Sequence, residues 1–343
     1  MIEIDGSIGE GGGQIVRSSL ALSLLTGKPF RMRKVRANRQ PKPGLRPQHL
    51  ASVRAAAQIG RAKVAGDAVG SSQLTFEPGK VTAGDYHFNI GTAGSTALVL
   101  HTVYLPLALS SGPSKVVLEG GTHNDKAPCF HFLQTTWRAY VAKIGLNISL
   151  GMERPGFYPR GGGRMLAHIE PWTKRQPLNV TAAVSQHSAT VLSMTAGLPD
   201  HVAKRQARRA TVRLRDVGID PEVSFEEWPG GPGCMLAITL PGPVPSLFFG
   251  LGARGKPAEA VADEAANEAL PFRKSGMPVD QHSADQLLLP LSLAEGDSEY
   301  RVSQVTRHLT TNAAVIQMFL ERAIVIDGEQ ESPGVVRVTG RAL

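Results

Sequence analysis

The feature that most constrains the fold is a supersecondary unit that recurs along this chain of 343 residues. The unit consists of a short strand, a glycine-rich loop, an apolar helix and a second strand. In the first copy we predict a strand over 2–5, a helix over about 14–26 and a strand over 30–36. The second copy begins with a strand over 86–90, and its apolar helix ends near Ser110. This alternation predicts an α+β chain of α/β repeats with helices on one face of each sheet.

Later copies of the unit are fainter. A third piece comprises a helix over about 129–144 and strands that end near 150 and 168. A fourth comprises a helix over 283–293 and another helix that begins near Asn312. Together the four pieces predict one large domain built from repeats.

The segment between the third and fourth pieces breaks this pattern. It predicts a strand over 180–194, a basic helix over 200–217 with Asp200 as its N-cap, and an acidic helix over 257–270. We therefore expect a small inserted α/β domain within a large repeat domain. The expected bounds are 1–179 and 277–343 for the large domain and 180–276 for the insertion.

The charge of the chain favours a polyanionic partner. The formal net charge is +8, and one segment concentrates basic residues while aromatic residues make up only 6% of the chain. We therefore expect contacts to phosphate rather than base stacking. The basic segment contains Arg31, Arg33, Lys34, Arg36, Arg39, Lys42 and Arg46. A second cluster, Lys204 to Arg215, is either an RNA contact or a solvated helix face, and we favour the solvated face.

Cysteine usage and hydropathy suggest an intracellular protein. Cys129 and Cys234 are far apart and neither belongs to a C-x-x-C pair, so we expect neither a disulfide framework nor a thiolate zinc site. The first residues lack the basic and apolar regions of a secretory signal. The longest apolar stretch is interrupted by His101 and Pro106 and is too short for a membrane span. We expect a cytoplasmic location.

The glycine loop of the first copy predicts a phosphate site. Gly9, Glu10, three further glycines, Gln14 and, three positions later, Arg17 connect the first strand to the first helix. Such a loop presents backbone N–H groups to an anion, and Glu10 is compatible with phosphate only if a divalent cation lies between them. Neither the dinucleotide fingerprint nor the P-loop pattern fits. A simple tight turn remains the alternative.

Near the other end of the chain, His308 precedes Thr310 and Thr311, which are able to cap the next helix. A helix N-terminus favours a neutral, nucleophilic imidazole, whereas a lone histidine is more often structural. Asp285 and Gln286 lie in the first turn of an apolar helix, where complementarity to the helix dipole is an equal explanation. We interpret other, isolated histidines as surface or structural residues: His49, His87, His131, His168, His187 and His201.

Taken together, these motifs closely resemble RNA 3′-terminal phosphate cyclase over nearly the whole chain. The resemblance includes the glycine loop, Arg36, Arg39, the run from Lys42 to Leu45, the run from Gln48 to Leu50, and the motif from Gly91 to Ser95. It continues through Gly120 to Thr122, Gly156 to Gly163, Asp285 to Leu287 and His308 to Asn312. The family has repeated units of two helices on a four-stranded sheet, with a small inserted α/β domain.

The resemblance implies an enzyme that uses ATP and Mg²⁺ or Mn²⁺ to convert the 3′-phosphate of an RNA to a 2′,3′-cyclic phosphodiester. It implies that His308 forms a covalent histidine–AMP intermediate and that Glu10 holds the metal. The implied RNA-phosphate ligands are Arg17, Arg36, Arg39 and Gln48, and the implied nucleotide contacts are His101, Pro128, His282, Asp285 and Gln286. The chain departs from the usual family residues at His101, Pro155 and His282, which bears on adenine selectivity.

Two alternatives remain open from the sequence. Cyclase-like proteins of ribosome assembly share the fold but lack the catalytic histidine, whereas here His308 stands in an intact Leu-x-Thr-Asn context. Small-molecule enolpyruvyl transferases are built from similar units, but the glycine loop and the basic segment favour an RNA-end phosphate. Incubation with ATP, Mg²⁺ and a 3′-phosphorylated RNA separates the three.

Overall fold

The computed structural model describes residues 1–341, and its first unit confirms the predicted alternation of strands and helices. The elements are β1 (Ile2–Asp5), α1 (Gly13–Thr26), β2 (Phe30–Arg33), α2 (Pro47–Gly60), β3 (Lys63–Ala65) and β4 (Leu74–Glu77). They form a four-stranded sheet in the order β1-β2-β4-β3. β1 and β2 are parallel because α1 crosses between them, and the remaining neighbours are antiparallel.

The second unit repeats this topology with different strand lengths. Its elements are β5 (Asp85–Asn89), α3 (Thr96–Ala108), β6 (Ser114–Gly120), the continuous helical segment α4–α5 (Phe130–Lys143), β7 (Ile148–Arg154) and β8 (Gly163–Ile169). The sheet order is β5-β6-β8-β7. A π-helical turn over Leu133–Trp137 joins α4 (Phe130–Phe132) to α5 (Arg138–Lys143). The second and third pieces predicted from the sequence are therefore two halves of one unit.

The third unit has the same strand order, β9-β14-β16-β15, and is split by the insertion. Its elements are β9 (Asn179–Val180), α8 (Gln281–Leu293), β14 (Ser298–Val302), α9 (Arg307–Phe319), β15 (Ile324–Asp327) and β16 (Gly334–Val338). The predicted strand over 180–194 is wrong, because β9 belongs to this sheet and the next strand belongs to another. Within residues 1–341 the unit thus occurs three times.

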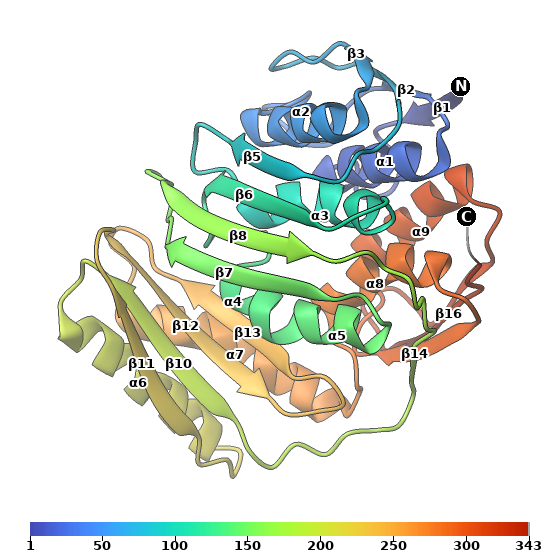
Figure 1. Ribbon diagram of the computed structural model, residues 1–343. Coiled ribbons are helices and arrows are strands. Elements are labelled where there is room, and N and C mark those ends of the chain that lie inside the picture. The colour runs from blue at the N-terminus through green and yellow to red at the C-terminus, as the bar shows by residue number, and fades with distance from the viewer. Residues whose placement is uncertain (342–343) are drawn as a thin grey trace.

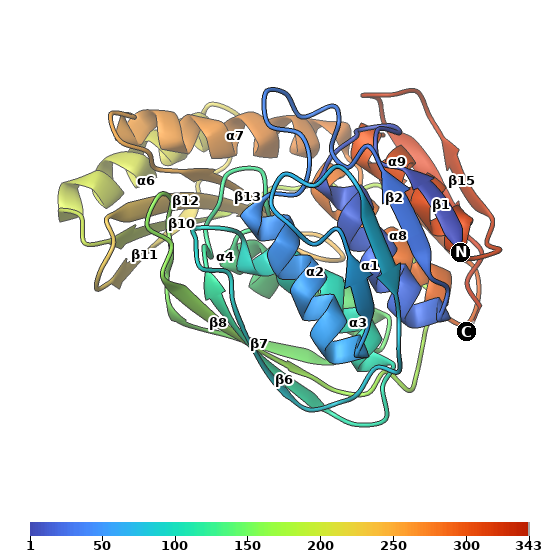
Figure 2. The same cartoon turned by 90° about the horizontal axis from the view of Figure 1, so that it is seen from above.

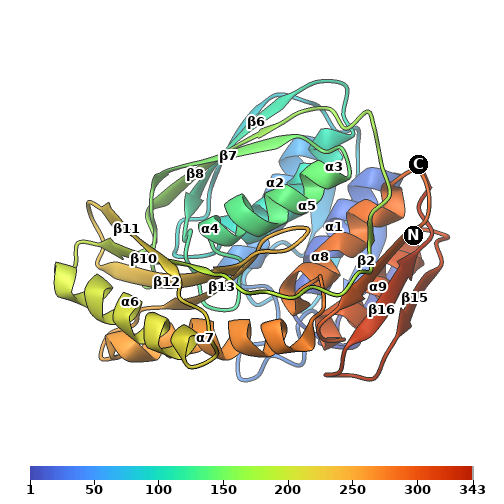
Figure 3. The same ribbon diagram turned by 90° about the horizontal axis from the view of Figure 1, so that it is seen from below.

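The inserted segment forms a separate four-stranded sheet covered by two helices that lie side by side (Figure 3). Its elements are β10 (Thr190–Ala196), α6 (Asp200–Arg215), β11 (Glu222–Trp228), β12 (Gly233–Leu240), β13 (Ser246–Leu251) and α7 (Ala258–Ser275). The N-cap of α6 is Pro199, not Asp200 as predicted, and Asp200 lies in the first turn. The architecture confirms the predicted α+β fold of repeated units, each with two helices on a four-stranded sheet, and a smaller α/β insertion.

Much of the basic face of α6 is paired within the insertion. Arg205 forms two hydrogen bonds with Glu259 of α7, at 2.8 and 2.7 Å. Arg209 and Arg213 both bind Asp263, and Arg213 also binds Asn267 at 3.0 Å. These arginines neutralise the acidic helix α7, so much of the second basic cluster has a structural explanation.

The helices of the three units pack together at the centre of the large domain, and the sheets lie outside them (Figures 1 and 2). α1 contacts both α3 and α9, so the first and last parts of the chain share one hydrophobic core. Fully buried side chains such as Leu20, Val99 and Ile316 join this core across the units. Among residues 1–341, the helices are all too short or too polar to cross a bilayer.

Candidate active site

A cavity of about 450 Å³ opens where the helices of the three units meet the inserted sheet. Seven of the residues predicted from the sequence line its wall. They are Arg17, His101, Pro128, His282, Asp285, Gln286 and His308. Gln14, Trp137 and Asn312 lie in the same wall and were not predicted. The cavity therefore joins residues from the first helix to the last one.

His308 lies in the first turn of α9, one residue after the helix begins at Arg307. The side chain of Thr306 caps this helix by accepting a hydrogen bond from the backbone N–H of Leu309 at 3.1 Å. The predicted cap at Thr310 and Thr311 is therefore wrong, and the helix starts earlier than expected. This shift places His308 at the positive end of the helix dipole, with 53% of its side chain exposed.

A hydrogen-bonded chain fixes the ring of His308. The amide nitrogen of Gln14 donates to Oδ2 of Asp285, so the amide oxygen faces His308. That oxygen lies 2.9 Å from Nδ1 of His308 and accepts its proton. Nε2 of His308 then carries the lone pair and lies 3.8 Å from Oε1 of Glu10. Gln14 directly follows the three glycines of the loop, and this position is the feature of the sequence that could have identified it as a site residue.

The surroundings keep His308 neutral. Burial lowers the pKa of His308, the charge of Asp285 opposes this effect, and Arg17 and Arg39 lower the pKa further. Burial in turn raises the pKa of Asp285, against the nearby His308 and His282. A neutral imidazole with a free Nε2 is a nucleophile near pH 7.

The glycine loop packs directly against two helices. Gly9 has a φ of +52°, and a Cβ on it would lie 2.1 Å from Oγ1 of Thr311 in α9. A Cβ on Gly13 would lie 2.2 Å from Nε2 of His49 in α2. The backbone N–H of Glu10 also donates to Oγ1 of Thr311 at 3.0 Å. The glycines therefore allow the close approach that brings Glu10 beside His308.

Glu10 suits a divalent cation. Its side chain is 9% exposed, and Oε1 pairs with the guanidinium of Arg39. The other carboxylate oxygen, Oε2, is buried and has no hydrogen-bond partner among residues 1–341. Mg²⁺ is commonly held by one or two carboxylates together with substrate phosphates, and one carboxylate of this kind is available here.

Arg36 and Gln48 lie outside the cavity wall. Arg36 donates to the carbonyl oxygens of Lys42 and Gly44 at 3.2 and 2.7 Å, so it holds the basic loop in shape. Oε1 of Gln48 accepts from the backbone N–H of Ser95 at 3.3 Å, which ties α2 to the glycine motif of the second unit. Both side chains are therefore hydrogen-bonded to backbone groups of the protein itself.

Arg17 in the cavity wall, Arg36 and Arg46 form a cluster of positive charges. Burial and the nearby charge of Arg36 lower the pKa of Arg17 to about 10, against the opposing effect of Asp285. Burial and the charge of Arg46 lower the pKa of Arg36. None of the three forms an ion pair with a carboxylate of the described chain. An uncompensated cluster of this kind is suited to a phosphate.

Some buried polar atoms in the cavity wall lack a hydrogen-bond partner within residues 1–341. Nε2 of His101 and Oε1 of Gln286 are buried and make no hydrogen bond to the part of the chain that the structure describes. Burial lowers the pKa of His101 to about 3, so its ring is neutral. His282 differs: burial lowers its pKa, but the hydrogen bond to Glu268 at 2.8 Å and the negative charges around the ring together raise it above the ordinary value. Unpartnered polar atoms beside Pro128 suit a heteroaromatic ligand.

The interpretation of the remaining histidines needs one correction. His131 was expected to be isolated, but it is buried and hydrogen-bonded to His123 and to Glu226. His49 is buried as well, and its Nδ1 accepts from the backbone N–H of Arg46 at 3.2 Å. The sequence did not reveal the group of His123, His131 and Glu226, because the two histidines belong to the second unit and Glu226 belongs to the insertion.

Comparisons with known proteins identify the family of the chain. The family model described as RNA 3′-terminal phosphate cyclase matches residues 8–326. The chain is 42% identical over 332 residues to the RNA 3′-terminal phosphate cyclase of Ectopseudomonas mendocina, with 94% of each chain covered. It is 40% identical over 347 residues to that of Methanopyrus kandleri, with 98% of each covered.

Solved structures give a weaker likeness. The enolpyruvyl transferase NikO from Streptomyces tendae matches with a TM-score of 0.28 and 12% identity, and the match covers 62% of this chain and 38% of that one. This similarity is too low to support an argument, whereas the sequence matches span nearly the whole chain. The chain belongs to the RNA 3′-terminal phosphate cyclase family.

Proposed function

We propose that the protein converts the 3′-terminal phosphate of an RNA to a 2′,3′-cyclic phosphodiester and consumes ATP in doing so. The observation that carries the proposal is the neutral His308, whose Nδ1 is bound by Gln14 and whose Nε2 is free, in the wall of a cavity of about 450 Å³. This volume is within the range of small-molecule sites. The family membership of the chain supports the same activity.

In the first step, Nε2 of His308 attacks the α-phosphorus of ATP. An N–P bond forms, the bond to pyrophosphate breaks, and the imidazole becomes positively charged. Gln14 accepts the Nδ1 proton in a hydrogen bond, and the carboxylate of Asp285 orients Gln14, so this charge is stabilised from behind the ring. The product is a histidine–AMP intermediate, which divides a difficult transfer into two easier ones.

In the second step, an oxygen of the RNA 3′-phosphate attacks the AMP phosphorus and releases His308. In the third, the vicinal 2′-hydroxyl attacks the terminal RNA phosphorus, and AMP leaves. The hydroxyl and the phosphate belong to one ribose, so the reacting groups are already close together. Arg17, Arg36 and Arg39 supply positive charge for the RNA phosphate, and Gln48 adds a hydrogen-bonding amide.

Two features support the placement of the ligands. The unpartnered Nε2 of His101 and Oε1 of Gln286 suit the adenine base, with Pro128 against its face and His282 in the same cavity wall. The unpartnered Oε2 of Glu10 suits Mg²⁺ or Mn²⁺, which when bound would neutralise phosphate charge.

The test is covalent labelling with α-³²P-ATP. The unaltered protein should retain label after denaturation, and His308→Ala should retain none, while the matched variant of the exposed His201, His201→Ala, should label normally. An RNA with a labelled 3′-phosphate should become resistant to phosphatase only with a protein that labels. Labelling of His308→Ala would show that the nucleophile is another residue. A wild-type protein that binds RNA but does not label would support a binding protein instead.

A further inference from the structure

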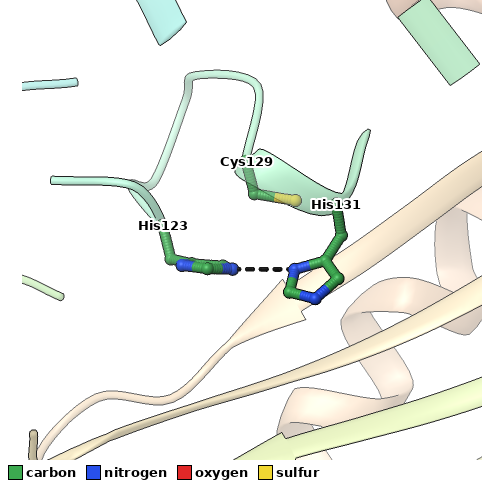
Figure 4. Close-up of side chains that lie close together, drawn as sticks. All are labelled: His123, Cys129 and His131. Carbon is green, nitrogen blue, oxygen red and sulfur yellow. Dashed lines mark hydrogen bonds between the residues drawn. The ribbon is translucent and has the colours of Figure 1, made fainter. Parts of the chain in front are cut away.

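His123, Cys129 and His131 lie close together in the second unit, in a group that the proposed reaction does not use (Figure 4). Their candidate ligand atoms all lie within 4.8 Å of one another. Nε2 of His123 is 3.0 Å from Nδ1 of His131. The three residues are 1%, 0% and 9% exposed, in that order. Two imidazoles and a thiol are thus enclosed together away from water.

The outer nitrogens of both rings have fixed partners. Nε2 of His131 lies 3.0 Å from Oε2 of Glu226, and a carboxylate accepts, so this nitrogen carries a proton. Nδ1 of His131 therefore presents a lone pair to His123. Nδ1 of His123 lies 2.8 Å from Oγ1 of Thr122, which also accepts from the backbone N–H of Gly156 at 2.9 Å. In metal-binding histidines the ring nitrogen that does not bind the metal is typically hydrogen-bonded to another group of the protein, as in both of these rings.

We propose that this cluster is a metal site that binds Zn²⁺ or a similar borderline-soft divalent ion through Nε2 of His123, Sγ of Cys129 and Nδ1 of His131. Two imidazoles and one thiolate form a donor set that Zn²⁺ prefers. Tetrahedral coordination at ordinary bond lengths needs ligand atoms about 3.3–3.6 Å apart, so small side-chain adjustments suffice. Glu226 is the carboxylate that orients His131.

Metal binding has a defined proton balance. The thiol of Cys129 releases its proton to solvent as the metal–sulfur bond forms. The proton between His123 and His131 leaves Nε2 of His123, and Nδ1 of the same ring takes one up and donates it to Oγ1 of Thr122. Both imidazoles remain neutral, so one proton is released for each ion bound.

The site would connect the inserted sheet to the second unit. Glu226 lies on β11 of the insertion, and its Oε1 also accepts from the indole N–H of Trp228. On the other side, Phe157 stacks on the ring of His123 with centroids 4.9 Å apart. Cys129 directly follows Asp125, Lys126, Ala127 and Pro128, which line the active-site cavity. A bound ion would therefore fix this loop and the insertion beside the nucleotide.

The site differs in chemistry from the one at Glu10. Glu10 offers oxygen to a hard ion such as Mg²⁺, whereas this cluster offers nitrogen and sulfur. Only the cluster can give a thiolate-to-metal absorption band, so the two sites are distinguishable in one protein. The inference is independent of the proposed reaction, because no step of that reaction uses these three residues.

The test is a Co²⁺ titration of the full-length, chelator-treated protein. We expect one ion per chain that gives the visible bands of tetrahedral Co²⁺ and a near-ultraviolet thiolate-to-cobalt band, and we expect Zn²⁺ to displace it. Cys129→Ser should lose the thiolate band, whereas Cys234→Ser should keep it, because Cys234 is also a buried free thiol but lies apart from the cluster. Glu226→Gln should weaken Co²⁺ binding roughly 10- to 100-fold.

A wild-type protein without the thiolate band overturns the proposal, and so does a Cys129→Ser protein that keeps it. If Cys129→Ser does not fold, as judged by circular dichroism, the wild-type spectrum and Glu226→Gln decide. Unchanged Co²⁺ affinity in Glu226→Gln would then contradict the assigned geometry.

Discussion

Oε1 of Gln14 lies 2.9 Å from Nδ1 of His308, although the two residues are 294 positions apart in the chain. An amide has one donor side and one acceptor side, and Asp285 occupies the donor side of Gln14. The acceptor side is thereby turned to His308, which fixes the proton on Nδ1 and leaves Nε2 free. One carboxylate thus determines which nitrogen of the proposed nucleophile carries the free lone pair.

Gln14→Met should slow self-adenylylation roughly 10- to 100-fold, because it removes a hydrogen bond to a ring that becomes charged. The apparent KM for ATP should change much less than the rate, since Met keeps the length of the side chain. Single-turnover labelling measures both quantities. Gln317→Met, at an exposed position of α9, the helix that carries His308, is the control. A large rise in KM with an unchanged rate would assign Gln14 to ATP binding instead.

The pH profile of labelling should report His308. Its pKa is lowered, so the rate should persist below pH 6.5 and fall only as the pH drops through the lowered value. The negative charge of Asp285 raises the pKa of His308, so Asp285→Asn should move the acid limb to still lower pH while reducing the maximal rate. A limb that moves to higher pH in Asp285→Asn would refute this electrostatic account.

Glu10→Gln should raise the Mg²⁺ concentration needed for half-maximal labelling by at least about tenfold, because the neutral amide is a poorer ligand. Mn²⁺ at high concentration should restore part of the rate. Glu3→Gln, on an exposed carboxylate that pairs with Arg31 at 3.5 Å, should leave the Mg²⁺ dependence unchanged. Equal Mg²⁺ curves for Glu10→Gln and the wild type would remove Glu10 from the metal site.

Gly9→Ala should destabilise the protein by about 2–4 kcal/mol, through a left-handed backbone strain and a clash with Thr311. Gly70→Ala tests the strain alone, because Gly70 has a φ of +84° and a Cβ there would meet nothing within 4 Å. Chemical denaturation should give a smaller loss for Gly70→Ala. Equal losses for the two variants would mean that the contact with Thr311 contributes nothing.

His49 should make folding sensitive to acid. Its pKa is lowered from 6.5 to about 3, first by burial and then by Arg17, Arg36 and Arg46. The unfolded chain therefore binds a proton that the folded chain does not, so this stability is fully present above pH 6.5 and is lost as the pH falls towards 3. His49→Asn keeps an acceptor for Arg46 and should flatten the unfolding free energy between pH 6 and 4 by up to about 1.4 kcal/mol per pH unit. An unchanged slope would contradict a neutral buried His49.

The sequence predicted the repeated α+β fold where the hydrophobic period is long and glycine marks the turn, as in the segments over 2–26 and 86–110. The prediction failed where an element is short or where a strand forms only by pairing with a neighbouring strand. β9 has two residues and exists only by pairing with β14, and β3 and β4 follow a stretch without clear alternation. The start of α9 was misplaced because Thr306, Thr310 and Thr311 are equally good caps in sequence, and the structure uses Thr306.

The candidate site was predicted in part. Glu10 and Arg17 were selected because they flank the glycine loop, the remaining site residues were assigned their roles from the family resemblance, and seven of the predicted residues line one cavity. Gln14 was missed because an amide has no distinctive spacing, and its role depends on contacts with Asp285 and His308. The cluster around Cys129 was missed because its three ligands span loop and helix within one unit and Glu226 lies in another.

The pairing of the first loop with the last helix has a consequence for synthesis of the protein. A growing chain carries Glu10 and Gln14 from the start, but α9, which supplies His308, is added only after the third unit has been interrupted by the whole insertion. Closing a contact across 294 residues is slow and needs the intervening units in place. The nascent chain therefore has no His308 beside its glycine loop until α9 has been made, so the proposed site assembles only after the whole insertion has been synthesised.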